Sequence, residues 1–212
     1  MKKAKAIVLV SMLLAIAAIM NAQEIFDAIR SGDLMKVKEL VEKDPQLVKA
    51  RNARQSTPLH VAVDMNNEPI VRYLLGKGIE SNVVNNNQWT PLFYAKTVEM
   101  AKLLIDHGSD VNFVGAFFTP LSVSLFEKRK AVAEYLLERG ARLPKIGTNE
   151  SLVVLRESLK NGSIVFLEKY LGQGFDPRSV NDVKNNLLHF AAEGGSVELI
   201  EKLISLGVPV NH

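Results

Sequence analysis

The apolar residues of this chain recur three and four positions apart in several short segments. Within 34–41 they fall on one helical face, and the same spacing returns within 199–204. Five such segments end in glycine, which readily takes the left-handed conformation that closes a helix. These glycines are Gly78, Gly108, Gly140, Gly174 and Gly207. The pattern predicts a series of short amphipathic helices, each ended by a glycine.

A second motif comes before these helices at a regular distance. Three segments begin with Thr-Pro-Leu, at Thr57, Thr90 and Thr119, and a fourth variant starts at Asn186. Threonine caps a helix when its side-chain oxygen accepts a hydrogen bond from a backbone N–H group of the first turn. Proline fits the first helical position, because a backbone N–H group at that position would have no partner within the helix. Thr57 and Thr90 are 33 residues apart, a period typical of repeat proteins. The sequence therefore predicts pairs of helices whose apolar faces are buried by stacking on neighbouring pairs.

The repeat resembles the ankyrin repeat. Its period, the segment 57–62 (TPLHVA) and the segment 108–112 (GSDVN) carry the resemblance. The family implies an all-α fold, a solenoid of about six stacked helix–turn–helix repeats with hairpin-like loops. Extending the phase of the motif along residues 23–212 places the starts of the repeats near residues 23, 57, 90, 119, 153 and 186.

Two repeats depart from this pattern. The third spans 19 positions from its threonine to its glycine where its neighbours span 22, and the missing residues fall between Lys96 and Val98. We expect its first helix to be short and the turn after it to be tight. The fifth repeat has lost the Thr-Pro-Leu motif, and the β-branched Val153 and Val154 weaken the prediction of a helix there.

Residues 1–22 have the features of a signal peptide. Three lysines precede an apolar run of 15 residues from Ala6 to Met20, and small residues surround the end of this run. The run is shorter than the roughly 20 apolar residues that span a bilayer. We expect cleavage after Ala22, which leaves Gln23 first, and thus a periplasmic or secreted bacterial protein with no stable membrane span. Cleavage after Ala17, a buried N-terminal helix and an uncleaved membrane anchor are the alternatives.

The distribution of charge argues against nucleic acid as a partner. The formal net charge is +3, and the three lysines of residues 1–22, a segment without acidic residues, account for all of it. The remainder carries no net charge and has no general attraction for phosphate groups. Cysteine is absent, which excludes disulfides, thiolate catalysis and sulfur-ligated metals.

The sequence offers no pattern of catalytic residues. It has neither G-x-S-x-G nor a glycine-rich phosphate-binding loop, and no two of its four histidines lie three or four positions apart. The resemblance implies that His60 and His189, at the fourth position of the motif, are structural and hydrogen-bond within and between repeats. His107 suits the C-terminal end of a helix. We therefore expect no enzymatic activity, no cofactor and no metal.

The resemblance also implies where a partner protein binds. Repeat solenoids expose an extended concave surface, formed in this family by the loop tips before each Thr-Pro-Leu motif and by exposed positions of each first helix. The corresponding residues are Arg54, Asp64, Met65, Asn86, Asn87, Trp89, Phe118, Phe126, Glu127, Asn185 and Glu193. We expect a monomeric scaffold that binds another protein. The alternatives are an inhibitor or protector of an exported enzyme, and a hydrolase or ligand sensor with a site of its own.

Trp89 and Phe118 each come directly before a Thr-Pro pair. Large aromatic residues on a loop suggest a binding hot spot, and stacked repeats would place these two side by side on one rim. The alternative is that they pack over the short third repeat and fill the space left by its missing residues. We assign the neighbouring Phe117 to packing.

Overall fold

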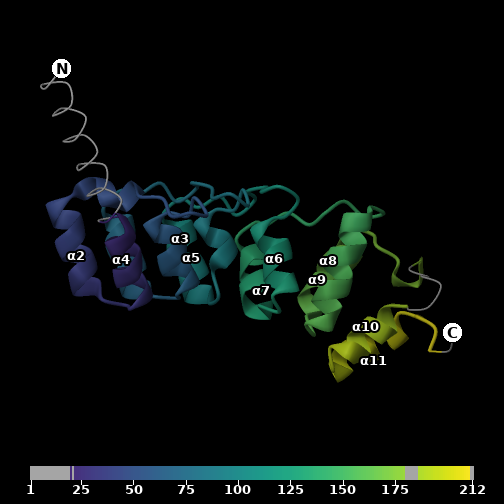
Figure 1. Ribbon diagram of the computed structural model, residues 1–212. Coiled ribbons are helices and arrows are strands. Elements are labelled where there is room, and N and C mark those ends of the chain that lie inside the picture. The colour runs from purple at the N-terminus through teal and green to yellow at the C-terminus, as the bar shows by residue number, and fades with distance from the viewer. Residues whose placement is uncertain (1–19, 21, 180–185, 211–212) are drawn as a thin grey trace, which may run out of the picture. The chain divides into compact units, whose positions relative to one another are not determined.

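The computed structural model describes Met20, residues 22–179 and residues 186–210 (Figure 1). The expected signal peptide, apart from Met20 and Ala22, lies outside these residues. In the part described, the regular elements are helices, and no helix combines the length and apolar content needed to cross a bilayer. The chain divides into two compact units, with the boundary between Asp110 and Val111.

The first unit contains three helical pairs. Residues 22–30 form a helix that leads to α2 (Leu34–Lys43) and the short 3-10 helix η1 (Pro45–Lys49). The second pair is α3 (Pro58–Asp64) and α4 (Glu68–Gly76), and the third is η2 (Pro91–Tyr94) and α5 (Val98–Asp106). α3 packs against both α4 and η2. The inward faces are aliphatic, with Ile29, Leu59, Leu74 and Leu104 fully buried.

The second unit repeats the arrangement. Its pairs are α6 (Pro120–Phe126) with α7 (Lys130–Glu138), α8 (Asn149–Lys160) with α9 (Ile164–Gly172), and α10 (Leu187–Glu193) with α11 (Val197–Ser205). The 3-10 helix η3 (Pro177–Ser179) follows α9. α8 packs against α6 and α10, so that each first helix lies against its neighbours. The all-α repeat architecture expected from the sequence is confirmed.

The start and stop signals of the repeat act as the sequence predicts. The Thr57 and Thr119 side chains accept from the backbone N–H groups of His60 and Ser122, and Pro58, Pro91 and Pro120 occupy first-turn positions. All five glycines that end the second helices have positive φ, between 75° and 91°. The repeat boundaries therefore follow from local backbone chemistry.

The third repeat is shortened as expected. Its first helix is the 3-10 helix η2, and Thr97, three residues after its end, caps α5 by accepting from the Met100 N–H. Thr90 makes no side-chain cap bond in η2, unlike Thr57 and Thr119. A single tight turn has no room for the regular capping geometry.

The fifth repeat forms its first helix although it lacks the Thr-Pro-Leu motif. α8 runs from Asn149 to Lys160, includes Val153 and Val154, and is longer than the first helices of its neighbours. Its cap is Thr148, which accepts from the Ser151 N–H at 3.2 Å. The helix thus begins before the expected start at Val153. Burial of Val154 and Leu155 against neighbouring helices outweighs the weak helix propensity of β-branched residues.

Candidate binding groove

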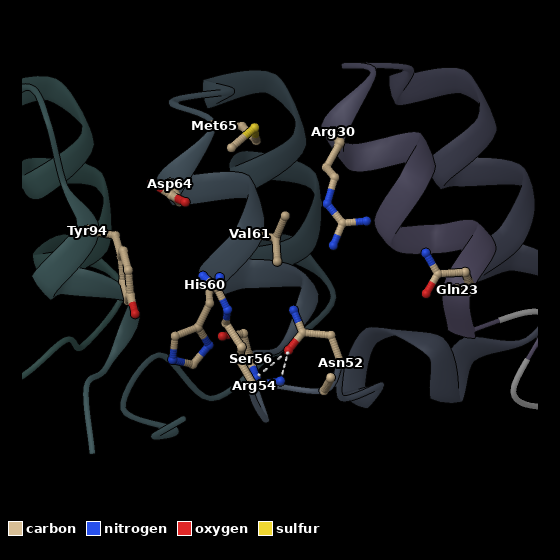
Figure 2. A pocket seen from close by; sticks show the side chains of 11 residues that line it. Gln23, Arg30, Asn52, Arg54, Ser56, His60, Val61, Asp64, Met65 and Tyr94 are labelled. Atoms are coloured by element: carbon tan, nitrogen blue, oxygen red, sulfur yellow. Dashed lines mark hydrogen bonds between the residues drawn. The ribbon is translucent and has the colours of Figure 1, made fainter. Parts of the chain in front are cut away.

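The first unit contains an open groove of about 390 Å³, shown from close by in Figure 2. Gln23 and Arg30 from the first helix line one side, and Asp64 and Met65 from the end of α3 line another. The loop residues 52–54 and Ser56 close one end, and Tyr94 of η2 contributes from the third repeat. Three of the expected contact residues, Arg54, Asp64 and Met65, therefore share one groove.

The loop at one end of the groove is held by an asparagine. Asn52 Oδ1 accepts from the backbone N–H groups of Arg54 at 2.9 Å and Ser56 at 3.0 Å, while Gln55 lies in the left-handed region with φ of 56°. These bonds close a tight hairpin whose tip is Ala53 and Arg54. Arg54 is presented to solvent by backbone geometry rather than by packing.

The next hairpin, 33 residues on, is built in the same way. Asn85 Oδ1 accepts from the N–H groups of Asn87 at 2.9 Å and Trp89 at 3.2 Å. Its Nδ2 donates to the Tyr94 hydroxyl at 2.7 Å and lies 3.5 Å from Ser56 Oγ. Asn85 is buried, and both ends of its amide are used. Sequence analysis missed these two asparagines, although each stands five residues before a Thr-Pro pair.

Two bonds fasten these hairpins to each other. The Asn86 N–H donates to the Arg54 carbonyl at 3.0 Å. Arg51 Nη1 donates to the carbonyls of Gln55 and Val84, both at 2.7 Å. Asn86 is thus joined to the first hairpin through its backbone. Asn86 and Asn87 are both exposed at the tip of the second hairpin. The hairpins form a continuous edge to the groove.

His60 lies behind this edge and connects two repeats. Its Nδ1 accepts from the Thr57 N–H at 3.2 Å and lies 2.8 Å from Thr57 Oγ1. Its Nε2 is 3.0 Å from the Trp89 carbonyl, so the neutral form with the proton on Nε2 satisfies both partners. Burial lowers the pKa of His60 to about 4, and the nearby Arg51 acts in the same direction. The structural role expected for this histidine is confirmed.

On the opposite edge of the groove, Asp64 is not a free carboxylate. Lys96, in the third repeat, lies 3.0 Å from Asp64 Oδ1 and also donates to the Asp64 carbonyl. Both side chains are more than two-fifths exposed, so this pair contributes little to stability. Met65 beside it is 45% exposed and makes the groove wall apolar there. The groove thus combines an arginine, amide groups and a thioether.

The comparisons with known proteins identify the repeat. The family described as "Ankyrin repeats (3 copies)" matches residues 25–114, which include every residue that lines the groove except Gln23. Residues 25–114 are therefore similar to ankyrin repeats. A crystal structure of the human ASB11 ankyrin repeat domain superposes with a TM-score of 0.68 at 20% identity, covering 89% of this chain and 85% of that one. At that identity the likeness establishes the fold alone.

Curated relatives differ widely in size and role. A yeast (Saccharomyces cerevisiae) protein, probable 26S proteasome regulatory subunit p28, is 27% identical over 86% of this chain and 86% of its own length. The human transient receptor potential cation channel subfamily A member 1 is 27% identical over 74% of this chain, which spans only 15% of the channel protein. The rat ankyrin repeat and SAM domain-containing protein 6 is 33% identical over 42% of this chain and 10% of its own length.

Trp89 belongs partly to the ankyrin core. It is half-buried, its ring stacks on Phe93 at 5.4 Å and 13°, and it meets the edge of Tyr94 at 5.6 Å. One face of the indole therefore covers the short helix η2, in line with the packing alternative. The expectation that Trp89 and Phe118 lie side by side stays a prediction, because the two residues belong to different units.

The remaining expected contact residues lie in the second unit. Phe118 and Phe126 meet edge to face at 5.9 Å and are 37% and 43% exposed. Glu127 is 3.7 Å from Arg129, and Glu193 is 3.2 Å from Lys160 across the fifth and sixth repeats. Asn185 lies outside the described residues. His189 is exposed and caps α10, with Nδ1 accepting from the Asn186 N–H at 3.2 Å.

The assignment of Phe117 to packing is wrong. This side chain is 89% exposed at the tip of its hairpin. Gly115 and Phe118 exchange both backbone hydrogen bonds, at 2.9 and 2.8 Å, which leaves only Ala116 and Phe117 in the turn. A two-residue turn projects its side chains away from the repeat. Within the residues that the structure describes, no cluster of three or more potential metal ligands occurs.

Proposed function

We propose that this ankyrin-repeat chain is a non-catalytic protein-binding module that acts after export and binds a partner protein in the groove of its first unit. Ankyrin repeats are generally protein–protein interaction modules. One observation carries the proposal for this chain: the groove exposes side chains that the fold does not use. Arg54 is held out by the Asn52 hairpin, and Met65 is 45% exposed.

The chemistry of the groove supports binding of an extended protein segment. The polar groups that maintain the fold, His60 and Asn85, are already satisfied within the chain. Arg54 offers a guanidinium for a carboxylate or a carbonyl, and Met65 with Val61 offers an apolar wall. A segment that pairs an acidic or amide group with an apolar side chain fits these surfaces.

Substitutions on the groove wall test the proposal. A tagged chain is used to isolate the partner from an extract of exported proteins, and affinities are then measured by calorimetry. We expect Arg54→Glu to weaken binding at least tenfold, which is about 1.4 kcal/mol, and Met65→Ala to weaken it severalfold. Met35→Ala is the matched control, because Met35 is 74% exposed on α2 and does not line the groove. Unchanged affinity in both groove variants would refute the proposal.

The same purified pair separates a scaffold from an inhibitor or protector. If the partner is an enzyme, its turnover is measured with and without a stoichiometric amount of this chain. A change in turnover that Arg54→Glu abolishes assigns the inhibitory or protective role, and unchanged turnover assigns the scaffold role.

Export is tested on the protein made in its own host. We expect mass spectrometry of the soluble exported fraction to give a mature N-terminus at Gln23. An intact N-terminus at Met1 in the membrane fraction would refute export as a soluble protein.

A further inference from the structure

The helix of residues 22–30 brings the core of the first unit close to the expected mature N-terminus. Ile25, Phe26 and Ile29 are at most 1% exposed. Gln23 and Glu24 are exposed, and Gln23 lines the groove (Figure 2). When Gln23 is the first residue, only these two residues separate the terminal α-amine from the buried core. Chain ends are preferred sites of proteolysis, so the loss of a few residues there would uncover the core.

We propose that Gln23 of the mature chain is cyclised to pyroglutamate, and that the ring protects the end of the first repeat from aminopeptidases. Gln23 becomes the first residue only through cleavage after Ala22, so this inference rests on the export proposed above. Aminopeptidases recognise the free α-ammonium group of their substrates, and pyroglutamate has none. The ring therefore stops the stepwise removal of residues before it reaches Ile25 and Phe26.

The cyclisation is an acyl transfer within one residue and needs no second reactant. The unprotonated α-nitrogen of Gln23 attacks Cδ of its own side chain, a bond forms between that nitrogen and Cδ, and the bond from Cδ to Nε2 breaks. One proton passes from the attacking nitrogen to the leaving nitrogen, which departs as ammonia, and Oε1 becomes the lactam oxygen. An α-amine has an ordinary pKa of about 8, so part of it is unprotonated at neutral pH.

The contacts of Gln23 allow the ring to close without the loss of a buried interaction. Gln23 Nε2 donates to Asp27 Oδ1 at 3.0 Å, and both residues are exposed, so water can replace this hydrogen bond. When Nε2 leaves, Asp27 keeps its ion pair with Arg30 at 2.9 Å. The buried side chains of the helix begin at Ile25 and take no part in the reaction.

The charges at the start of this helix favour the neutral ring over a free amine. The N-terminus of a helix carries a partial positive charge, which repels a terminal ammonium group. The two nearest acidic residues in sequence are already paired, Glu24 with Lys36 at 3.1 Å and Asp27 with Arg30. Cyclisation removes the ammonium charge and with it this repulsion.

Mass spectrometry of the protein purified from its host tests the modification. We expect the N-terminal peptide to begin at residue 23 and to be lighter, by one ammonia, than the peptide that the sequence encodes. A free amine on Gln23 would overturn the inference and leave export with cleavage after Ala22 intact. A terminus at Ala18 would overturn the inference but not export, and an intact Met1 would refute both.

Digestion with a broad-specificity aminopeptidase tests the protective role on the same mature protein. Gln23→Asn is the matched variant, because it keeps the amide but is one methylene shorter, and its lactam would be a strained four-membered ring. We expect the wild type to keep its mass and the variant to lose its first two residues, as far as the buried Ile25.

Removal of the ring provides the control for this digestion. Treatment with pyroglutamyl aminopeptidase, which releases only the cyclised residue, should leave the wild type with a free amine on Glu24 and make it as susceptible to further digestion as Gln23→Asn. Equal digestion of the untreated wild type and the variant would overturn the protective role. Resistance of the variant would also overturn it, because the fold alone would then protect the terminus.

Discussion

Mild acid should destabilise the first unit through His60. The buried ring is neutral, accepts at Nδ1 from Thr57 and donates from Nε2 to the Trp89 carbonyl. Protonation would place an N–H on Nδ1 against the Thr57 N–H and leave a positive charge in the core. The pKa falls from 6.5 in the unfolded chain to about 4 in the folded one. The unfolded state therefore binds more protons, and stability is lost as the pH falls from 6.5 towards 4.

The size of the effect follows from these two pKa values. At 1.36 kcal/mol for each unit of difference, the full loss below pH 4 is about 3 kcal/mol. At pH 5 the folded protein is still mostly unprotonated at this site, and the loss is about 2 kcal/mol. With a urea slope of about 2 kcal/mol per molar, the midpoint of unfolding should fall by about 1 M between pH 7.5 and pH 5.

Urea unfolding followed by the fluorescence of Trp89 measures this loss in the first unit. The matched variant is His60→Gln, because the amide of glutamine can donate to the Trp89 carbonyl and does not titrate. When the pH is lowered from 7.5 to 5, the free energy of unfolding of His60→Gln should decrease by about 2 kcal/mol less than that of the wild type. His189→Gln, at an exposed position, should behave like the wild type. An equal loss in the wild type and His60→Gln would show that His60 titrates normally and would refute this reasoning.

Three further predictions concern buried or close contacts. Asn85→Ala should lower the free energy of unfolding by about 2–3 kcal/mol, because it leaves the Trp89 N–H and the Tyr94 hydroxyl without their partner; chemical denaturation checks it. Trp89→Ala should cost about 1–3 kcal/mol for its two ring contacts, and the native indole emission should lie between those of buried and exposed tryptophan. Gly194→Ala should destabilise the second unit by more than about 2 kcal/mol, because an added Cβ would meet the Leu159 carbonyl oxygen at 2.3 Å. Gly76→Ala, with no atom within 4 Å of an added Cβ, should be neutral or stabilise by up to about 1 kcal/mol, as thermal unfolding of both variants would reveal.

The predictable part of this fold is the part fixed by local chemistry. Thr57 and Pro58 start the first helix of a repeat, and Gly78 ends the second helix, by local backbone effects that do not depend on tertiary packing. The repeat and its short third copy could therefore be recognised from the sequence. The helix that contains Val153 and Val154 could not be predicted with the same certainty from the sequence, because it depends on the packing of the buried residues Leu155 and Leu159. In the candidate site, Arg54 and Met65 were expected at the groove. The hydrogen bonds of Asn85 and the exposure of Phe117 depend on the shapes of individual hairpins, which the repeat motif does not specify.

The hydrogen bonds between successive repeats also bear on how quickly the chain folds. Asn82 Nδ2 donates to the Gly108 carbonyl over 26 positions, Arg51 reaches Val84 over 33, and Asn161 reaches Leu125 over 36. Each of these contacts closes a loop of about one repeat, and the entropy of loop closure depends only on that length. Low contact order of this kind is typical of rapid folding. Duplicating a whole repeat would add contacts with the same sequence separation. The time needed to form each contact would therefore not increase with the length of the chain.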